Sequence, residues 1–188
     1  MIDPTTGRVR KLRRAFSDPG HAHELTFSCH QRLPMLAKDR TRTWFLESLD
    51  AARHRWDSDL WAYVIMPEHV HPLLFPRFDV YAISDILKAI KQAVARRATE
   101  WLRANDRRFL ERLKVTRPGG RTEYRFWQQG GGYDRNIVNP RAAWGSVDYL
   151  HLNPVRRGLV ETPTEDLVKC PVLRRPRWRS TARGRSTT

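Results

Sequence analysis

Two short stretches of the sequence combine side chains that can bind a metal ion or act as a nucleophile. The first runs from residue 67 to residue 71 and reads PEHVH. In a strand, residues two apart point to the same face, so His69 and His71 would project together. Two neutral imidazoles side by side are a natural pair of metal ligands. Two partly exposed strand histidines without a ligand would show the same pattern, so this stretch alone leaves both readings open.

The second stretch runs from residue 149 to residue 153 and reads YLHLN. On a helix, residues four apart share a face, which would place Tyr149 one turn from Asn153. With a pKa near 10, only about 0.1% of a phenol is ionised at neutral pH. A divalent cation can compensate by polarising the phosphate under attack. Tyr149 could then attack a phosphate on a metal bound by His69, His71 and Asn153. Alternatively, Tyr149 is a half-buried amphipathic residue and Asn153 merely ends a helix.

Tyr133 is the alternative nucleophile. It follows three glycines and precedes Asn136 by three positions. Mobility would suit a nucleophile, but the glycines argue against a preformed helical face. We therefore rank Tyr133 second to Tyr149.

The charge of the chain indicates a polyanionic partner. Its 188 residues include 35 Lys and Arg against 20 Asp and Glu, a net charge of +15. Such an excess is typical of proteins that bind nucleic acid. The segment 169–188 holds seven basic residues and no acid, which predicts a DNA-contacting arm or, alternatively, a solvated tail. Trp127 and Trp178 lie among arginines and could stack on unpaired bases, although Trp127 could equally pack in a core.

Length and composition predict one domain with basic ends. We divide the chain into an arm (1–20), a catalytic domain (21–165) and a tail (166–188). No apolar run is long enough for a membrane span and the first residues have no apolar signal core. We therefore expect a cytoplasmic, nucleoid-associated protein without a membrane partner. Cys29 and Cys170 are expected to be reduced, with Cys29 a small core or strand residue.

Hydrophobic periodicity predicts the order β-α-β-β-α-β-α, which is a split βαβ pattern with an added helix. The predicted fold class is α+β, with helices on one face of a small, mainly antiparallel sheet. We expect a flexible joint at the three glycines 130–132 and a loop or hairpin over 107–124. The predicted strands are 24–30, 60–66, 69–75 and, less regularly, 125–128, and the predicted helices are 39–56, 83–104 and 141–153.

Two blocks of the chain resemble a known family. Residues 62–71 (AYVIMPEHVH) and 149–160 (YLHLNPVRRGLV) look like the single-tyrosine HUH transposases, above all the REP-associated tyrosine transposases of bacteria. The second block is the more specific one. The segments FWQ at 126–128 and WRST at 178–181 also look like family features. The resemblance extends over most of the chain, from about residue 21 to residue 183.

The resemblance implies a ferredoxin-like palm domain with His69, His71 and Asn153 as metal ligands and Tyr149 as the nucleophile. It also implies Mg²⁺ or Mn²⁺ and cleavage of single-stranded DNA beside a folded hairpin (a palindromic repeat). The product would be a 5′-phosphotyrosine link and a free 3′-hydroxyl. Pro72 departs from the family pattern, because proline removes a ladder donor beyond His71. The residues expected to contact DNA are Arg156, Arg157, Arg174, Arg175, Arg177, Trp178 and Arg179.

We therefore predict a metal-dependent endonuclease and strand transferase of the transposase type, favoured as a monomer although a homodimer is possible. The first alternative is a non-catalytic single-stranded nucleic-acid-binding module on the same fold. The second is a metal hydrolase that uses the two histidines with water as its nucleophile. Substitution of Tyr149 would spare that hydrolase but not the transposase.

Overall fold

The centre of the molecule is a five-stranded antiparallel sheet, seen in a computed structural model that describes residues 17–162 and 168–169. Its strand order is β6-β1-β3-β2-β7. The connection β1-α1-β2-β3-α2-β6 is the split βαβ arrangement, so the predicted α+β class is confirmed. The strands are β1 (Ala22–Ser28), β2 (Ser58–Met66), β3 (His69–Pro76), β6 (Tyr133–Ile137) and β7 (Val168–Lys169).

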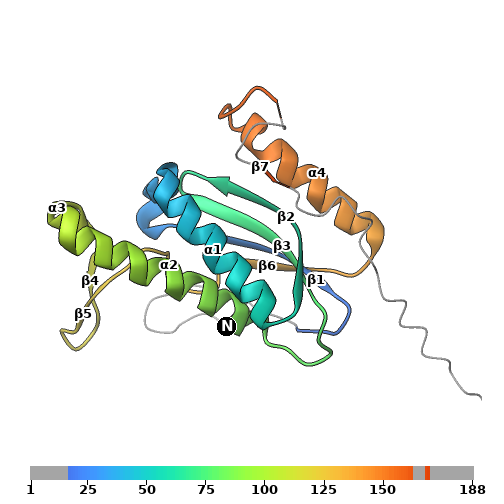
Figure 1. The fold of residues 1–188 in the computed structure, drawn as a ribbon, viewed down its shortest axis with the longest axis horizontal. Helices are drawn as coiled ribbons and strands as arrows, with labels where there is room; N and C mark the ends of the chain where they lie inside the picture. Colours follow the sequence, from blue (N-terminus) through green and yellow to red (C-terminus); the bar gives the residue numbers. More distant parts are fainter. Residues whose placement is uncertain (1–16, 163–167, 170–188) are drawn as a thin grey trace, which may run out of the picture.

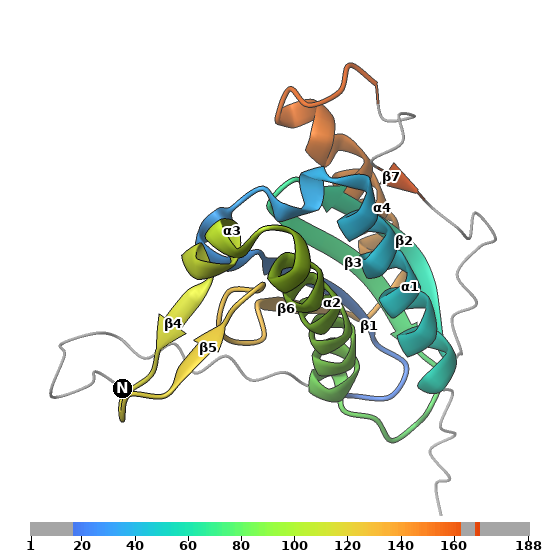
Figure 2. The ribbon, with the colours of Figure 1, turned by 60° about the vertical axis from the view of Figure 1, so that its left-hand side comes forward.

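Helices cover both faces of this sheet. Helices α1 (Asp39–Arg55) and α2 (Ile83–Asn105) lie side by side on one face (Figure 1), and α4 (Pro140–Arg156) packs on the other (Figure 2). The prediction of helices on a single face is therefore wrong for α4. The smaller elements are η1 (His30–Arg32), η2 (Met35–Ala37), α3 (Arg107–Arg112) and the hairpin of β4 (Lys114–Thr116) with β5 (Thr122–Tyr124).

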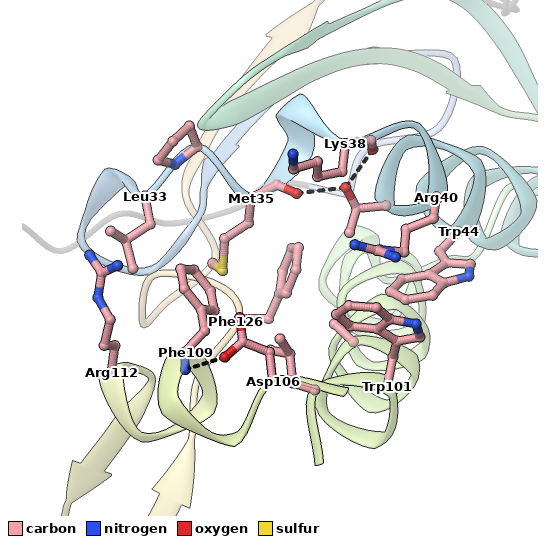
Figure 3. A pocket seen from close by; sticks show the side chains of 14 residues that line it. Leu33, Met35, Lys38, Arg40, Trp44, Trp101, Asp106, Phe109, Arg112 and Phe126 are labelled. Atoms are coloured by element: carbon pink, nitrogen blue, oxygen red, sulfur yellow. Dashed lines mark hydrogen bonds between the residues drawn. The ribbon is translucent and has the colours of Figure 1, made fainter. Parts of the chain in front are cut away.

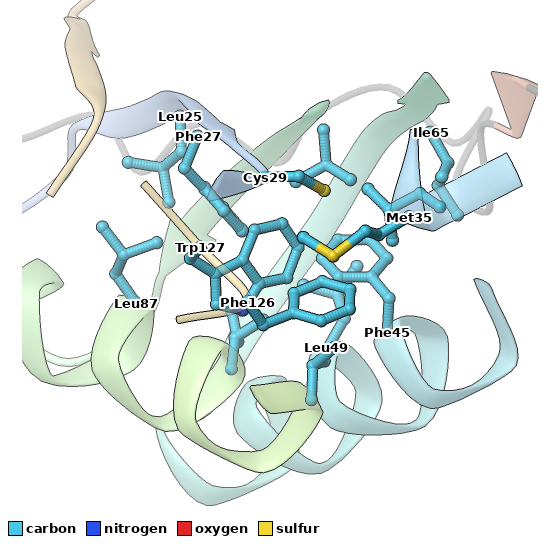
Figure 4. Close-up of a cluster of buried hydrophobic side chains, with 14 of the residues drawn as sticks. Leu25, Phe27, Cys29, Met35, Phe45, Leu49, Ile65, Leu87, Phe126 and Trp127 are labelled. Atoms are coloured by element: carbon cyan, nitrogen blue, oxygen red, sulfur yellow. The ribbon is translucent and has the colours of Figure 1, made fainter. Parts of the chain in front are cut away.

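The larger core lies between the sheet and the pair α1 and α2. Alternate residues of β1 and the position that follows it point into this core, namely Leu25, Phe27 and Cys29 (Figure 4). They meet the predicted apolar stripes of α1 and α2, including Phe45 and Leu87. The reduced, buried Cys29 confirms its predicted core position. Cys170 lies outside the described residues.

A second core on the opposite face explains why β2 reads as a continuous apolar run. Tyr63 and Ile65 point toward α1, whereas Val64 and Met66 point toward α4. A strand that is covered on both faces has no polar face to present. The β2 register shifts between Leu60 and Ala62, so the alternation changes phase there.

The predicted fourth strand at 125–128 is wrong. Trp127 forms only an isolated bridge with Cys29, and the fourth core strand is β6. The indole of Trp127 is buried, donates its N–H to the Lys91 carbonyl at 3.0 Å and packs edge-on against Phe27. Core packing, not base stacking, is therefore its role. The aromatic residues of the segment 125–128 suggested a strand because buried core positions and strands favour the same residue types.

Two prolines are accommodated within regular elements. Pro72 lies inside β3, which continues to Pro76. The pairing of β3 with β1 is interrupted between Val70 and Leu73, where Pro72 lies. Pro154 lies in the last turn of α4, and the helix continues to Arg156 rather than ending at the predicted Asn153. The backbone N–H of Arg157 still donates to the Asn153 carbonyl at 3.2 Å, which closes the helix after the proline.

Candidate active site

Strand β3 places His69 and His71 on the face of the sheet that α4 covers. Their backbones pair with Met66 and Val64 of β2, and both residues are buried, at 6% and 5% exposure. The ring centroids are 4.7 Å apart with an interplanar angle of 80°. The two histidines share a face as predicted, and they are buried rather than partly exposed.

Each ring has one nitrogen held by a neighbour. The Glu68 Oε1 atom lies 3.1 Å from His69 Nδ1. Because a carboxylate only accepts, Nδ1 carries the proton and the Nε2 lone pair is available to a ligand. The His71 Nδ1 atom lies 2.7 Å from Thr26 Oγ1 on β1. The buried Nε2 of His71 has no hydrogen-bond partner among the described residues.

Both imidazoles are held in the neutral form. Burial lowers the pKa of His71 to about 3, and nearby His69 and Arg157 act in the same direction. Burial also lowers the pKa of His69, against the opposing effect of Glu68. Metal ligation needs an unprotonated nitrogen, so a neutral ring with an unpaired, buried Nε2 fits a metal ligand. A buried polar atom without a partner otherwise carries a desolvation cost.

Helix α4 begins with a strong capping sequence and presents its apolar side to the sheet. The Asn139 side chain accepts from the backbone N–H of Ala142 at 2.9 Å, and Pro140 takes the first helical turn. Val147 and Leu150 enter the second core. These contacts orient the adjacent face of α4, which carries the predicted nucleophile.

Tyr149 and Asn153 lie on this helix as the spacing predicts. The Tyr149 side chain is 41% exposed, and its ring centroid is 6.2 Å from that of His71 with an interplanar angle of 89°. Asn153 is buried one turn later. The Arg156 guanidinium lies 5.9 Å from the centre of the Tyr149 ring. The structure thus brings Tyr149 beside the histidine pair while leaving it accessible.

Tyr133 occupies a different setting from the predicted one. It lies on β6 opposite Thr26 and is 48% exposed. Because residues three apart on a strand point to opposite faces, Tyr133 and Asn136 do not form a pair on one face. The preceding glycines are also no simple flexible joint: a Cβ on Gly132 (φ +84°) would lie 2.1 Å from the Thr26 carbonyl oxygen. Only glycine permits this close approach of β6 to β1.

The sequence analysis missed two groups of this site. Thr26 reaches His71 only through the pairing of β1 with β3, and nothing local in the sequence indicates this contact. Glu68 lies within the PEHVH run but was not assigned a role. Its Oε1 also accepts from Arg157 Nη2 at 2.8 Å, which connects the β2–β3 turn to the end of α4.

The remaining predicted DNA contacts divide into two groups. Arg156 and Arg157 lie exposed at the end of α4, close to the histidine pair. The other five lie outside the described residues: Arg174, Arg175, Arg177, Trp178 and Arg179. Among the described residues, no three or more His, Cys, Asp and Glu side chains gather at one point. A metal site here would therefore need a ligand of another residue type beside the two imidazoles.

A separate pocket of about 440 Å³ lies among η2, α1, α2 and α3, on the other side of the sheet (Figure 3). Its walls include Trp44, Trp101 and Phe109, with cations beside them. The Arg40 guanidinium lies 3.5 Å from the centre of the Trp101 ring. Asp106 also lines the pocket, but its carboxylate caps α3 by accepting from the Phe109 N–H at 2.9 Å. None of the predicted catalytic residues lines this pocket.

The fold defines a class: an α+β domain of ferredoxin-like topology with an added helix on the second face. Its architecture is similar to that of a REP-associated tyrosine transposase bound to a REP hairpin, with a TM-score of 0.61 and 18% identity over 85% of this chain and 82% of that chain. A protein from Deinococcus radiodurans R1, described provisionally as a transposase, aligns over 76% of this chain and 97% of its own at 18% identity and a TM-score of 0.44.

No protein-family model matches the sequence, and neither does any curated protein. The structural similarity therefore establishes the fold. No helix among the described residues is both long and apolar enough to cross a membrane.

Proposed function

We propose that the protein is a transposase-type nuclease that cleaves and rejoins single-stranded DNA beside a hairpin, with Tyr149 as the nucleophile. The observation that carries this proposal is the position of an accessible tyrosine beside a neutral histidine pair, one of whose buried nitrogens has no partner. The net charge of +15 supports an anionic polymer as substrate. The structurally similar transposase is bound to a hairpin, which supports the same class of substrate.

In this proposal the chain's own residues hold and orient the reacting groups. His69 and His71 would bind Mg²⁺ or Mn²⁺ through Nε2, and Asn153 would add its amide oxygen. When bound, the ion would polarise the scissile phosphate and stabilise developing charge. Arg156 and Arg157 would contact neighbouring phosphates. The buried setting of the imidazoles keeps them unprotonated and preoriented.

The covalent step is a transesterification. The Tyr149 Oη atom attacks phosphorus and loses its proton, and the bond from phosphorus to the 3′-oxygen breaks. The 3′-oxygen leaves and takes up a proton, so the products are a 5′-phosphotyrosine and a free 3′-hydroxyl. In the reverse sense, a 3′-hydroxyl attacks the phosphotyrosine and rejoins a strand. The phosphodiester energy is conserved, so no ATP is needed.

A denaturing gel tests this function directly. The full chain is incubated with Mn²⁺ and labelled single-stranded hairpin DNAs that have varied flanking sequences. We expect a covalent protein–DNA band that Tyr149→Phe and EDTA both abolish. Tyr133→Phe is the matched control, because Tyr133 is similarly exposed on the neighbouring strand β6. An adduct that survives in Tyr149→Phe but disappears in Tyr133→Phe would show that Tyr133, and not Tyr149, is the nucleophile. Cleavage that survives both changes would favour a hydrolase that uses water.

The aromatic pocket favours one second candidate, a non-catalytic binder of single-stranded nucleic acid. Arginines lie against the rings of both Trp101 and Trp44, and an indole beside a guanidinium suits an unpaired base next to a phosphate. A binder would keep its affinity in EDTA and form no adduct on any hairpin. Filter binding with and without EDTA, run beside the gel, separates the two functions.

A further inference from the structure

One carboxylate connects the histidine strand to the tyrosine helix. Glu68 Oε1 lies 3.1 Å from His69 Nδ1 and 2.8 Å from Arg157 Nη2. Glu68 lies in the turn that joins β2 to β3, and Arg157 immediately follows α4. The contact spans 89 residues of sequence. It joins two elements that no other described charge pair connects directly.

On the strand side, the carboxylate determines which nitrogen of His69 faces a ligand. Because Glu68 only accepts, the contact keeps the proton on Nδ1 and leaves the lone pair on Nε2. The His69 ring is buried and Glu68 is nearly so, at 13% side-chain exposure, so water competes weakly for this hydrogen bond. Carboxylates that orient a ligating imidazole in this way commonly change metal affinity strongly when they are removed.

On the helix side, the same oxygen holds the end of α4. Arg157 is the C-terminal cap of α4, and its backbone N–H donates to the Asn153 carbonyl at 3.2 Å. An arginine that is anchored to Glu68 therefore fixes the last turn of the helix, which carries Asn153 and follows Tyr149. A guanidinium has five N–H donors, so this ion pair leaves others for a phosphate.

We propose that Glu68 is a positioning residue that sets the His69 tautomer and, through Arg157, holds the tyrosine helix against the histidine strand. This inference rests on the proposed function for its catalytic consequence. Its structural consequences, the tautomer and the metal affinity, can be measured without DNA. Arg157, predicted as a DNA contact, thereby gains a second role, because one of its guanidinium nitrogens already donates to Glu68.

The first test reads the tautomer in the metal-free protein by ¹⁵N NMR of the histidine side chains. In the wild type, His69 should show a protonated Nδ1 and an unprotonated Nε2. Glu68→Ala should shift the population toward the Nε2–H tautomer, and Glu68→Gln should largely restore the Nδ1–H form because its amide oxygen still accepts. An unchanged tautomer in Glu68→Ala would overturn the proposal.

The second test measures Mn²⁺ affinity by titration calorimetry. Glu68→Ala should weaken binding by about 10–100-fold, as is typical when the hydrogen-bond partner of a ligating histidine is lost. Glu68→Gln should recover most of that loss, which a merely structural effect of truncation would not explain. Glu47→Ala is the matched control, because Glu47 forms an ion pair with Arg97 between α1 and α2. Mn²⁺ affinity of Glu68→Ala within about twofold of the wild type would refute the role, given the expected range.

The third test addresses the helix side with Arg157→Met, which leaves the Glu68–His69 contact in place. We expect a wild-type His69 tautomer together with slower formation of the covalent adduct. Glu68→Ala combined with Arg157→Met should lose less rate than the sum of the two single losses, because both changes break one shared connection. Additive losses would show that Arg157 acts independently of Glu68. Absence of an adduct in the wild type itself would instead contradict the proposed function, while the tautomer test would still stand.

Discussion

The buried His71 side chain should make the stability of the metal-free protein depend on acid pH. Burial lowers its folded-state pKa to about 3, whereas an unfolded histidine has a pKa near 6.5. The folded state therefore favours the neutral ring, and the unfolded chain takes up a proton first as the pH falls. The contribution of this neutral histidine is fully present above about pH 6.5. It is lost progressively as the pH falls from there toward about 3.

The size of this effect follows from proton linkage. One pKa unit corresponds to about 1.4 kcal/mol, so stability should fall with that slope per pH unit below 6.5. Between pH 6.5 and pH 5 the loss from His71 alone is about 2 kcal/mol. His71 is only 5% exposed, so solvent screening reduces this figure little. Other groups titrate in the same range, so the comparison must be made with a variant that lacks only this one.

The measurement is urea unfolding in EDTA at several pH values for the wild type and His71→Gln. The difference in the free energy of unfolding between the two proteins should be constant above pH 7. It should then shift by about 2 kcal/mol against the wild type by pH 5. The same comparison with His54→Gln, an exposed histidine on α1, controls for the loss of a histidine outside the site. A difference that stays constant from pH 7.5 to pH 5 would refute the assignment of His71 as a buried neutral ring.

Three further predictions concern the elements that support the site. Tyr81→Phe should lower stability by about 1–3 kcal/mol, because the fully buried His23 loses a 2.7 Å contact with the Tyr81 hydroxyl; a urea midpoint equal to that of the wild type would contradict this. Gly132→Ala should cost more than about 3 kcal/mol, since its Cβ would meet the Thr26 carbonyl at 2.1 Å. Gly120→Ala, which has a similar positive φ but open space around it, should cost only about 1 kcal/mol, and equal losses would show that the contact is unimportant. With Cys170 replaced by serine, the thiol of Cys29 should react with a disulfide reagent only upon unfolding, because burial raises its pKa to about 12; rapid labelling of the native protein would argue against this packing.

Local periodicity accounts for what could be predicted of the fold. The strands that carry Leu25 and His71 and the apolar stripe around Ile90 follow from repeats of two and of three to four residues. These repeats do not require knowledge of distant contacts. The strand β6 escaped prediction because it reads YDRNI, mostly polar, and forms an edge of the sheet before the chain turns into α4. The aromatic pair at Phe126 and Trp127 was mistaken for that strand because it fills the core beside β1.

Which side chains share a face could be predicted from spacing within each element. His69 and His71 are two apart on a strand, and Tyr149 and Asn153 are four apart on a helix, so the backbone geometry of each element brings its own pair together. The packing of α4 against the face of β3 where the histidines lie is a property of the folded chain. The same holds for the contact of Thr26 with one imidazole and for the contacts by which Glu68 joins the other imidazole to Arg157. These contacts depend on strand register and on helix packing between segments far apart in the chain, which no local repeat of residues encodes.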